Sequence, residues 1–199
     1  MVRRSQEDRS RATTTRLMQT GRRLFGERGY HAVSAEEIGA AAGVTRGALH
    51  HHFGDKRGLF QQVLEELEIE NTAEVRAAVA AAPDVLSGLT AGLGSFLDIC
   101  QRPEVVQIAL TDAPAVLGWP AWREMEARHG LGLITEALTQ AREQGLVAEA
   151  AIPVLAQLFL SAITEAGLII ANADDPAAKR GEVEQSLLLM INGVLITGQ

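Results

Sequence analysis

Cysteine is almost absent from this sequence of 199 residues, in which Cys100 is the only one. A single thiol cannot close an intramolecular disulfide, and a cysteine cluster that could bind zinc is excluded as well. Long apolar runs are also missing, because the longest uncharged stretches, 150–164 and 185–199, fall short of the roughly 18 residues that cross a bilayer. No apolar segment follows the basic start MVRRSQEDRSR, so a secretory signal is not expected. We predict a cytoplasmic protein without a membrane span.

The sequence likewise lacks the patterns of common catalytic sites. It contains no G-x-S-x-G motif, no paired catalytic carboxylates and no cluster of metal ligands. Gly88, Gly92 and Gly94 do not form G-x-G-x-x-G and follow no predicted strand, so close packing of helices explains them better than a nucleotide site. We predict that the protein is not an enzyme and that it uses no cofactor and no metal.

The charge of the chain is divided unevenly along its length. Residues 1–60 carry 11 basic and 6 acidic side chains, a net charge of +5, whereas the remainder carries 7 and 19, a net charge of -12. A basic N-terminal part on an acidic body favours a polyanionic partner for the N-terminal part alone, since phosphate would repel the rest.

Almost every segment shows the periodicity of a helix rather than that of a strand. Glycine and proline separate these segments, and Gly29 is expected to end the first helix. The last helix is apolar around most of its circumference, so we expect a partner subunit to cover it. The sequence predicts an all-α fold of about nine helices, of which the later ones span 55–82, 84–101, 104–111, 120–144, 153–172 and 177–197.

Two short helices joined by a glycine turn are predicted near the N-terminus. Ser34 and Glu37 form a capping box at the start of the first helix, and Thr45 caps the second. The turn at Gly43 spans about three residues, so the pair forms a helix-turn-helix over about 34–53. The second helix fits the major groove of DNA, which is about 12 Å wide.

The second helix of this pair has an inner and an outer face. Leu49 and Phe53, one turn apart, are expected to face a small core. Arg46 can make two hydrogen bonds to guanine, and Gly47 lets the backbone approach closely. Consecutive histidines on a helix point about 100° apart, so these are not expected to share a metal ion. The predicted outer face consists of Arg46, Gly47, His50 and His51.

The run SAEEIGAAAGVTRGALHHHFGDKRGLF resembles the DNA-binding segment of TetR-family transcriptional regulators, whose usual pattern is a capped helix, AGVS/T-x-G-x-x-Y-x-H-F and a helix that begins with lysine. The resemblance extends over roughly residues 10–67. It implies phosphate contacts from Ser34, Thr45 and Lys56 and base reading by Arg46 and its neighbours. His50 stands where the family usually has tyrosine, so its contact, and any pH dependence that it introduces, stay open.

The resemblance also implies the organisation of the whole chain. Residues 1–55 would form a three-helix DNA-binding domain, and 56–199 a larger helical domain for effector binding and dimerisation, joined to the first by the helix 55–82. A homodimer would form through the last two helices, about 153–197. We expect a repressor that a small apolar or amphipathic ligand releases from a palindromic operator in double-stranded DNA. The alternative is a helical small-molecule-binding protein whose DNA head no longer reads sequence.

Two further groups of residues have open roles. The arginines at 3, 4, 9 and 11 could form an arm that reaches the minor groove, although a frayed tail attracted to DNA of any sequence is the simpler expectation.

An apolar effector pocket would be lined by residues of the second domain, where most large side chains simply form the core. Asp112 and Glu165 could select a cationic ligand, but Asp112 stands at a plausible helix start, where capping is the simpler role. The candidate pocket residues are Phe96, Cys100, Leu110, Asp112, Trp119, Trp122, His129, Phe159 and Ile163.

Overall fold

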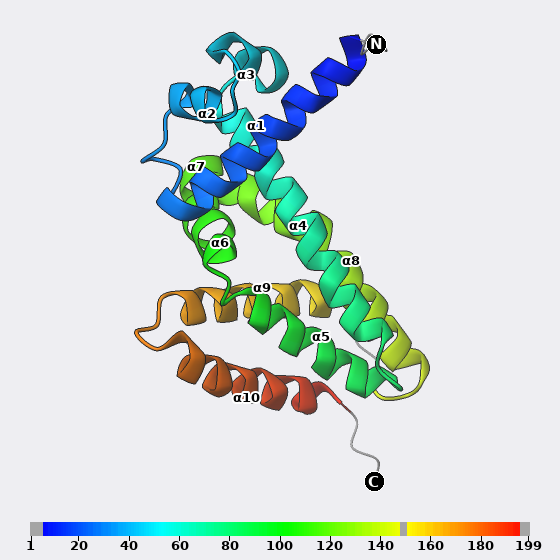
Figure 1. Ribbon diagram of the computed structural model, residues 1–199. Coiled ribbons are helices and arrows are strands. Elements are labelled where there is room, and N and C mark those ends of the chain that lie inside the picture. Colours follow the sequence, from blue (N-terminus) through cyan, green and yellow to red (C-terminus); the bar gives the residue numbers. More distant parts are fainter. Residues whose placement is uncertain (1–5, 148–150, 196–199) are drawn as a thin grey trace. The chain divides into compact units, whose positions relative to one another are not determined.

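The computed structural model describes residues 6–147 and 151–195, except for the side chains of Gln6 and Arg46. These residues form helices and no β-strand, apart from one isolated bridge between Val147 and Leu195. The prediction of an all-α fold is therefore confirmed. In chain order the elements are α1 (Gln6–Arg28), α2 (Ala35–Ala41), α3 (Arg46–Phe53), α4 (Lys56–Ala80), α5 (Val85–Ile99), α6 (Pro103–Val105), the π-helix η1 (Val106–Asp112), α7 (Ala113–Leu117), α8 (Trp119–Glu143), α9 (Ile152–Ala171) and α10 (Pro176–Val194) (Figure 1).

Most predicted helix boundaries lie within a few residues of the observed ones, and the main difference is at 103–117. We expected one helix over 104–111 and a break at Pro114, but the chain continues through η1 into α7. Pro114 lies in the first turn of α7, a position at which proline is common in helices. Proline thus begins a helix here instead of interrupting one. The predicted end of the last helix at 197 lies outside the described residues.

The chain packs as two compact units, which we call the head and the body. The head comprises residues up to Leu67 together with Pro103–Trp119, and the body comprises Glu68–Arg102 together with the residues from Pro120 onward. The division between them falls within α4, which both units share. We predicted the domain boundary at residue 55 from the expected roles of the two parts. In the structure, residues 103–119, which follow that boundary in the chain, pack with the head.

Three polar links hold the segment 103–119 within the head. Arg22 of α1 donates to both carboxylate oxygens of Glu104, at 2.6 and 3.0 Å. Arg57 donates to the carbonyl oxygens of Val116 and Leu117, at 3.2 and 3.4 Å. The third link joins Asp112 to the loop between α1 and α2 and is described with the site below.

The core of the head packs the three N-terminal helices on the first half of α4. Phe25 and Phe60 are fully buried and meet edge to face, with ring centroids 5.3 Å apart. Each fully buried side chain of this size contributes about 1.5–3 kcal/mol relative to its exposed state. Leu49 and Phe53 are also buried, as predicted, which fixes the inner face of α3.

The body contains two apolar clusters. One joins α5, α9 and α10 around Leu97 and Ile170, and the other joins α8 and α9 around Leu138 and Ala156. A Cβ at Gly92 of α5 would lie 2.7 Å from Val79 of α4, so the close helix packing that the sequence predicted for this glycine is confirmed.

Cys100 is buried, and burial raises the pKa of its thiol to about 12, with smaller contributions from the charges of Glu68 and Glu126.

Helix α9 has the length and composition of a membrane-spanning helix, although 39% of its most apolar window is buried within the chain itself. A core helix of a soluble protein meets the same criterion.

Candidate nucleic-acid interface

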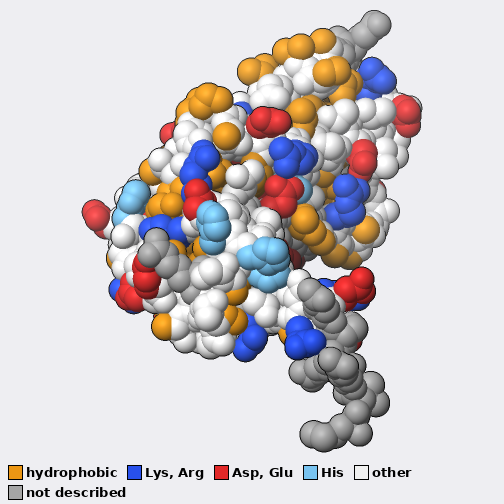
Figure 2. Space-filling model, turned by 90° about the horizontal axis from the view of Figure 1, so that it is seen from above, with side chains coloured by type: hydrophobic (Ala, Val, Ile, Leu, Met, Phe, Trp, Pro, Cys, Tyr) orange, Lys and Arg blue, Asp and Glu red, His pale blue; other side chains and the backbone are white. Residues whose placement is uncertain are grey.

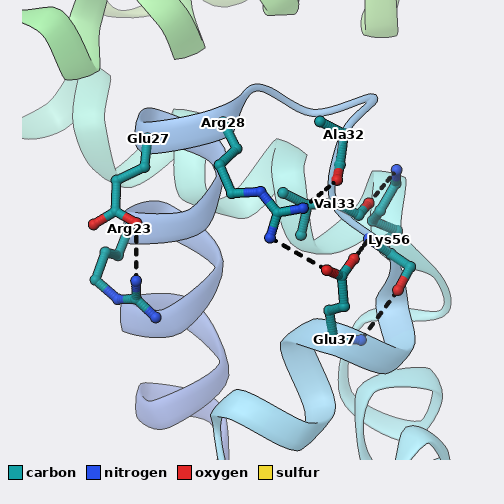
Figure 3. Close-up of polar contacts among 8 residues, drawn as sticks. Arg23, Glu27, Arg28, Ala32, Val33, Glu37 and Lys56 are labelled. Carbon is teal, nitrogen blue, oxygen red and sulfur yellow. Dashed lines mark hydrogen bonds and ion pairs between the residues drawn. The ribbon is translucent and has the colours of Figure 1, made fainter.

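The start of α2 is a complete capping box, as the sequence predicted. The Ser34 hydroxyl accepts a hydrogen bond from the Glu37 N–H at 3.1 Å, and the Glu37 carboxylate accepts one from the Ser34 N–H at 2.8 Å. Arg28 donates to Glu37 at 3.2 Å and to the Ala32 carbonyl at 2.8 Å (Figure 3). The bond from the Ser34 N–H, followed by interactions with the Ser34 and Arg28 side chains, lowers the pKa of the Glu37 carboxyl group. The loop that leads into α2 is therefore tied at both ends.

The turn and the start of α3 also match the prediction. Gly43 has a φ of +64°, a left-handed conformation that glycine adopts without strain, and Thr45 accepts a hydrogen bond from the Ala48 N–H at 3.3 Å. Gly54, with a φ of +78°, follows α3 directly. A Cβ at Gly58 would collide with the Phe53 carbonyl oxygen, so the α3–α4 junction requires a glycine there. The helix-turn-helix is thus fixed by local sequence at each of its ends.

The outer face of α3 is exposed. Gly47, His50 and His51 are all exposed, whereas His52 is half-buried and its Nδ1 lies 3.3 Å from the Thr14 hydroxyl of α1. Arg46 is the first residue of α3, and its side chain lies outside the described part of the chain. Figure 2 shows histidine side chains at the surface with Lys and Arg side chains near them. Gly47, His50 and His51 thus share the exposed side of a helix that Thr45 caps.

Lys56, the first residue of α4, points back toward the loop between α1 and α2. Its Nζ donates to the carbonyl oxygen of Val33 at 2.8 Å (Figure 3). It also donates to the Tyr30 carbonyl at 2.9 Å and lies 3.9 Å from the centroid of the Tyr30 ring. Burial lowers the pKa of Lys56, while the charges of Asp112 and Glu37 act in the opposite direction. Two of the three ammonium donors are thus used within the head.

Asp112 supports the same loop from the other side. Its carboxylate is buried and accepts hydrogen bonds from the Tyr30 N–H at 2.7 Å and from the Gln107 side chain at 3.1 Å. The capping role that the sequence favoured for Asp112 is wrong, because its side chain makes no cap hydrogen bond to α7. The carboxylate instead links η1 to the loop that precedes Ser34.

Replacing Asp112 by alanine is expected to destabilise the head. The change leaves the Tyr30 N–H and the Gln107 amide without their buried acceptor, which costs about 1–3 kcal/mol. A chain of this length then melts roughly 2–4 °C lower for each kcal/mol lost. Thermal unfolding followed by circular dichroism measures the change. Asp98→Ala, which removes an exposed carboxylate paired with Arg180, is the control and should shift the midpoint much less. Equal midpoints for Asp112→Ala and the wild type would contradict this role.

The candidate pocket residues are divided between the two units. Leu110, Asp112 and Trp119 belong to the head, and Trp119 is 61% exposed. In the body, Phe96 and Ile163 pack against one apolar cluster and Phe159 belongs to the other. Three more lie in the body, where Cys100 and Trp122 are buried and His129 is half-buried.

A polar cluster between α8 and α9 was not predicted from the sequence. The Glu126 carboxylate accepts hydrogen bonds from Arg123 at 2.8 Å and from the Thr164 hydroxyl at 3.0 Å, and Arg123 also donates to Ser161 at 2.9 Å. Burial raises the pKa of Glu126, and these partners oppose the shift. Arg123 and Glu126 are three residues apart, which in sequence is indistinguishable from an exposed ion pair on a helix.

Two of the four arginines considered for an N-terminal arm lie in a helix instead. Arg9 and Arg11 lie within α1, and Arg11 is 3.8 Å from Glu7 one turn earlier. The prediction of an extended arm or a frayed tail is therefore wrong for these two residues, since α1 begins at Gln6. Arg3 and Arg4 lie outside the described residues.

A capped helix-turn-helix with an exposed polar second helix, on an otherwise helical chain, defines a helix-turn-helix transcriptional regulator. Residues 17–63 match the family model described as bacterial regulatory proteins of the tetR family, and residues 86–194 match that of the Tetracyclin repressor-like C-terminal domain. The second match covers more than half of the chain. The protein therefore belongs to the TetR family of DNA-binding transcriptional regulators.

Individual relatives agree with this assignment. A TetR-family transcriptional regulator from Pectobacterium atrosepticum is 33% identical in sequence, and its crystal structure superposes with a TM-score of 0.86 over 98% of this chain and 100% of that one. The Transposon Tn10 TetC protein of Escherichia coli is 24% identical over 89% of each chain. The HTH-type transcriptional regulator AcrR of Shigella flexneri is 37% identical over 37% of each chain. Regulators of this family bind DNA operators and small-molecule effectors and act as dimers.

Proposed function

We propose that a homodimer of this chain binds a near-palindromic operator through two copies of α3 and represses transcription until a small apolar or amphipathic ligand binds to the body. For two copies of α3 to enter successive major grooves on one face of DNA, they must lie about 34–36 Å apart. The net charge of +5 on residues 1–60, against -12 on the remainder, supports DNA binding by the N-terminal part alone.

Gly47 is the observation that carries the proposal. Glycine within a helix is about 1 kcal/mol less favourable than alanine. The fold does not require glycine at this position, because Gly47 has no positive φ and a Cβ there would meet only the Thr45 hydroxyl at an ordinary 3.8 Å. Close approach of a large partner to the exposed face of α3 explains the choice. Arg46, one residue earlier, is then placed to read a base, with His50 and His51 as further donors.

The helix starts supply the phosphate contacts in this proposal. Ser34 and Thr45 each accept an amide hydrogen bond through the hydroxyl oxygen, and each hydroxyl group can donate its own hydrogen to a phosphate oxygen. Lys56 has one donor left after its bonds to Tyr30 and Val33. A phosphate that accepted this third bond would bind a lysine whose position the loop already fixes.

Exposed apolar residues on α9 and α10 support dimerisation through these two helices. In the single chain Val154 and Leu158 are 60% and 63% exposed, and Leu189 and Met190 are 74% and 52% exposed. Val154 and Leu158 are one turn apart and therefore lie on one face of α9. A second copy of the chain would cover both faces, which also accounts for the apolar composition of α9 without a membrane.

Effector release requires that the ligand favour one form of the dimer over the other. Shifting the population from 99:1 to 1:99 needs about 5.5 kcal/mol of differential binding. Helix α4 runs from Lys56 in the head to Ala80 in the body, so a change of its tilt would alter the spacing of the two α3 helices. The polar cluster at Glu126 and the candidate residues of the body are the groups to test for ligand contacts.

Binding to the DNA that flanks the gene tests the function. In fluorescence anisotropy we expect at least about 1,000-fold tighter binding to that DNA than to a random duplex of equal length. A footprint should show two half-sites whose centres are about 10 base pairs, or a multiple of that, apart. Equal affinity for both duplexes, together with binding of small molecules, would favour the alternative of a ligand-binding protein whose head no longer reads sequence.

A further inference from the structure

Helix α1 carries a stripe of polar and basic side chains that pairs with no carboxylate among the residues that the structure describes. Arg9, Thr13 and Arg16 are spaced i, i+4 and i+7, which places them on one side of the helix. Leu17 and Phe25, which face the core of the head, are fully buried, whereas Arg9 and Arg16 are exposed. A surface hollow of about 570 Å³ follows this side of α1 and is lined by Arg9, Ala12, Thr13, Thr15 and Arg16.

The arginines of α1 differ in what they contact. Arg22, Arg23 and Arg28 each pair with a glutamate, at 2.6, 2.9 and 3.2 Å. Among the residues that the structure describes, no carboxylate pairs with Arg9 or Arg16. The Arg16 Nε donates only to the Ala12 carbonyl of its own helix, at 3.4 Å. Two positive charges on one stripe therefore stay uncompensated while the charges further along the helix are neutralised.

The stripe lies beside the helix-turn-helix. The Arg16 Nη1 is 3.8 Å from the position that a Cβ on Gly43 would take, which places the guanidinium against the turn between α2 and α3. On a neighbouring side of α1, Thr14 contacts His52 of α3. Figure 1 shows that α3 and the first turns of α1 lie at the same end of the head. A duplex bound to the outer face of α3 would thus bring its sugar-phosphate backbone close to this stripe.

We propose that Arg9 and Arg16 form a second DNA-contacting surface of the head, which binds backbone phosphates next to the groove that α3 enters. The chemistry is that of guanidinium and phosphate, which form short charge-assisted hydrogen bonds. Such contacts fix the orientation of a protein on the duplex and carry no base preference. The proposal rests on operator binding by α3 and adds residues outside the helix-turn-helix to it.

The dependence of DNA affinity on salt concentration distinguishes phosphate contacts by Arg9 and Arg16 from base contacts by α3. Each phosphate contact contributes about 0.9 to the slope of log K against log salt concentration, so Arg16→Ala should lower the slope by about 1.8 for a dimer. The Arg9→Ala, Arg16→Ala double variant should lower it by about 3.6 if both side chains bind. The loss of affinity should be equal on the operator and on a random duplex, and should shrink as salt rises. Fluorescence anisotropy over a salt series gives both quantities.

Two variants serve as controls. Arg23→Ala removes an exposed arginine of the same helix that is already paired with Glu27, so its slope should equal that of the wild type. Arg16→Lys keeps the charge and should keep most of the slope. An Arg16→Ala variant with the wild-type slope, or an Arg23→Ala variant with an equal loss, overturns the proposal. If the wild type binds the flanking DNA and random DNA equally, operator recognition fails, but the slope on random DNA still decides whether Arg16 contacts phosphate.

Discussion

Replacing Leu189 by glutamate should convert the protein to a monomer and weaken operator binding at least about 100-fold. A monomer contacts only one half-site of the operator. It therefore loses much of the roughly 10³–10⁷-fold by which specific binding exceeds binding to random DNA. Leu189 lies on α10 and is 74% exposed in the single chain. In the proposed dimer the same position is buried, and a carboxylate without a partner there opposes association strongly. Sedimentation velocity gives the oligomeric state and fluorescence anisotropy the affinity.

Ile69→Glu is the matched control for this change. Ile69 is also a large apolar residue of the body and is 54% exposed, but it lies on α4 and not on the two terminal helices. This variant should stay dimeric and bind the operator as the wild type does. Dimeric Leu189→Glu with unchanged affinity would rule out the α9 and α10 surface as the subunit contact.

Replacing Arg46 by alanine should weaken binding to each half-site by about 1–3 kcal/mol, roughly 5-fold to 150-fold, and relax the preference at one base position. Arg46 begins α3, and the residues at the start of a recognition helix are those that reach the base edges. The charge alone should not suffice, since lysine cannot form the planar pair of hydrogen bonds that guanidinium makes to guanine. Arg46→Lys is therefore expected to bind random DNA as the wild type does but to lose the base preference.

A set of operators with one base pair changed at a time measures this effect. At one position in each half-site, changing the base pair should weaken binding of the wild type strongly. The same change should leave the affinity of Arg46→Ala unaltered. Equal losses on the operator and on random DNA would assign Arg46 to a phosphate instead of a base.

The parts of the interface that depend on neighbouring residues could be predicted from the sequence. The capping box at Ser34, the cap at Thr45 and the left-handed Gly43 are local devices, in which the side chain and its partner lie within a few residues. The inner face of α3 followed from spacing alone. These features repeat wherever the same short sequence occurs, so the motif specifies its own geometry.

The contacts that position the motif could not be predicted, because they join residues far apart in the chain. Lys56 reaches carbonyl groups of a loop more than 20 residues earlier, and Asp112 reaches Tyr30 across 82 residues. Neither pairing leaves a periodic signal in one sequence. The assignment of 103–119 to the second domain followed chain order, whereas the ion pair of Arg22 with Glu104 joins this segment to the head. Pocket residues were similarly underdetermined, since the same apolar side chains serve a core or a ligand.

The buried thiol of Cys100 limits the kinds of signal that this regulator can sense. Oxidants and electrophiles act on the thiolate form of cysteine. Burial raises the pKa of the Cys100 thiol to about 12, so the unreactive thiol form prevails at neutral pH. Because the chain has no second cysteine, peroxide cannot be registered by closing a bond within one subunit. Oxidation at sulfur is therefore a poor signal for this chain, which agrees with the proposed control by a ligand that binds reversibly.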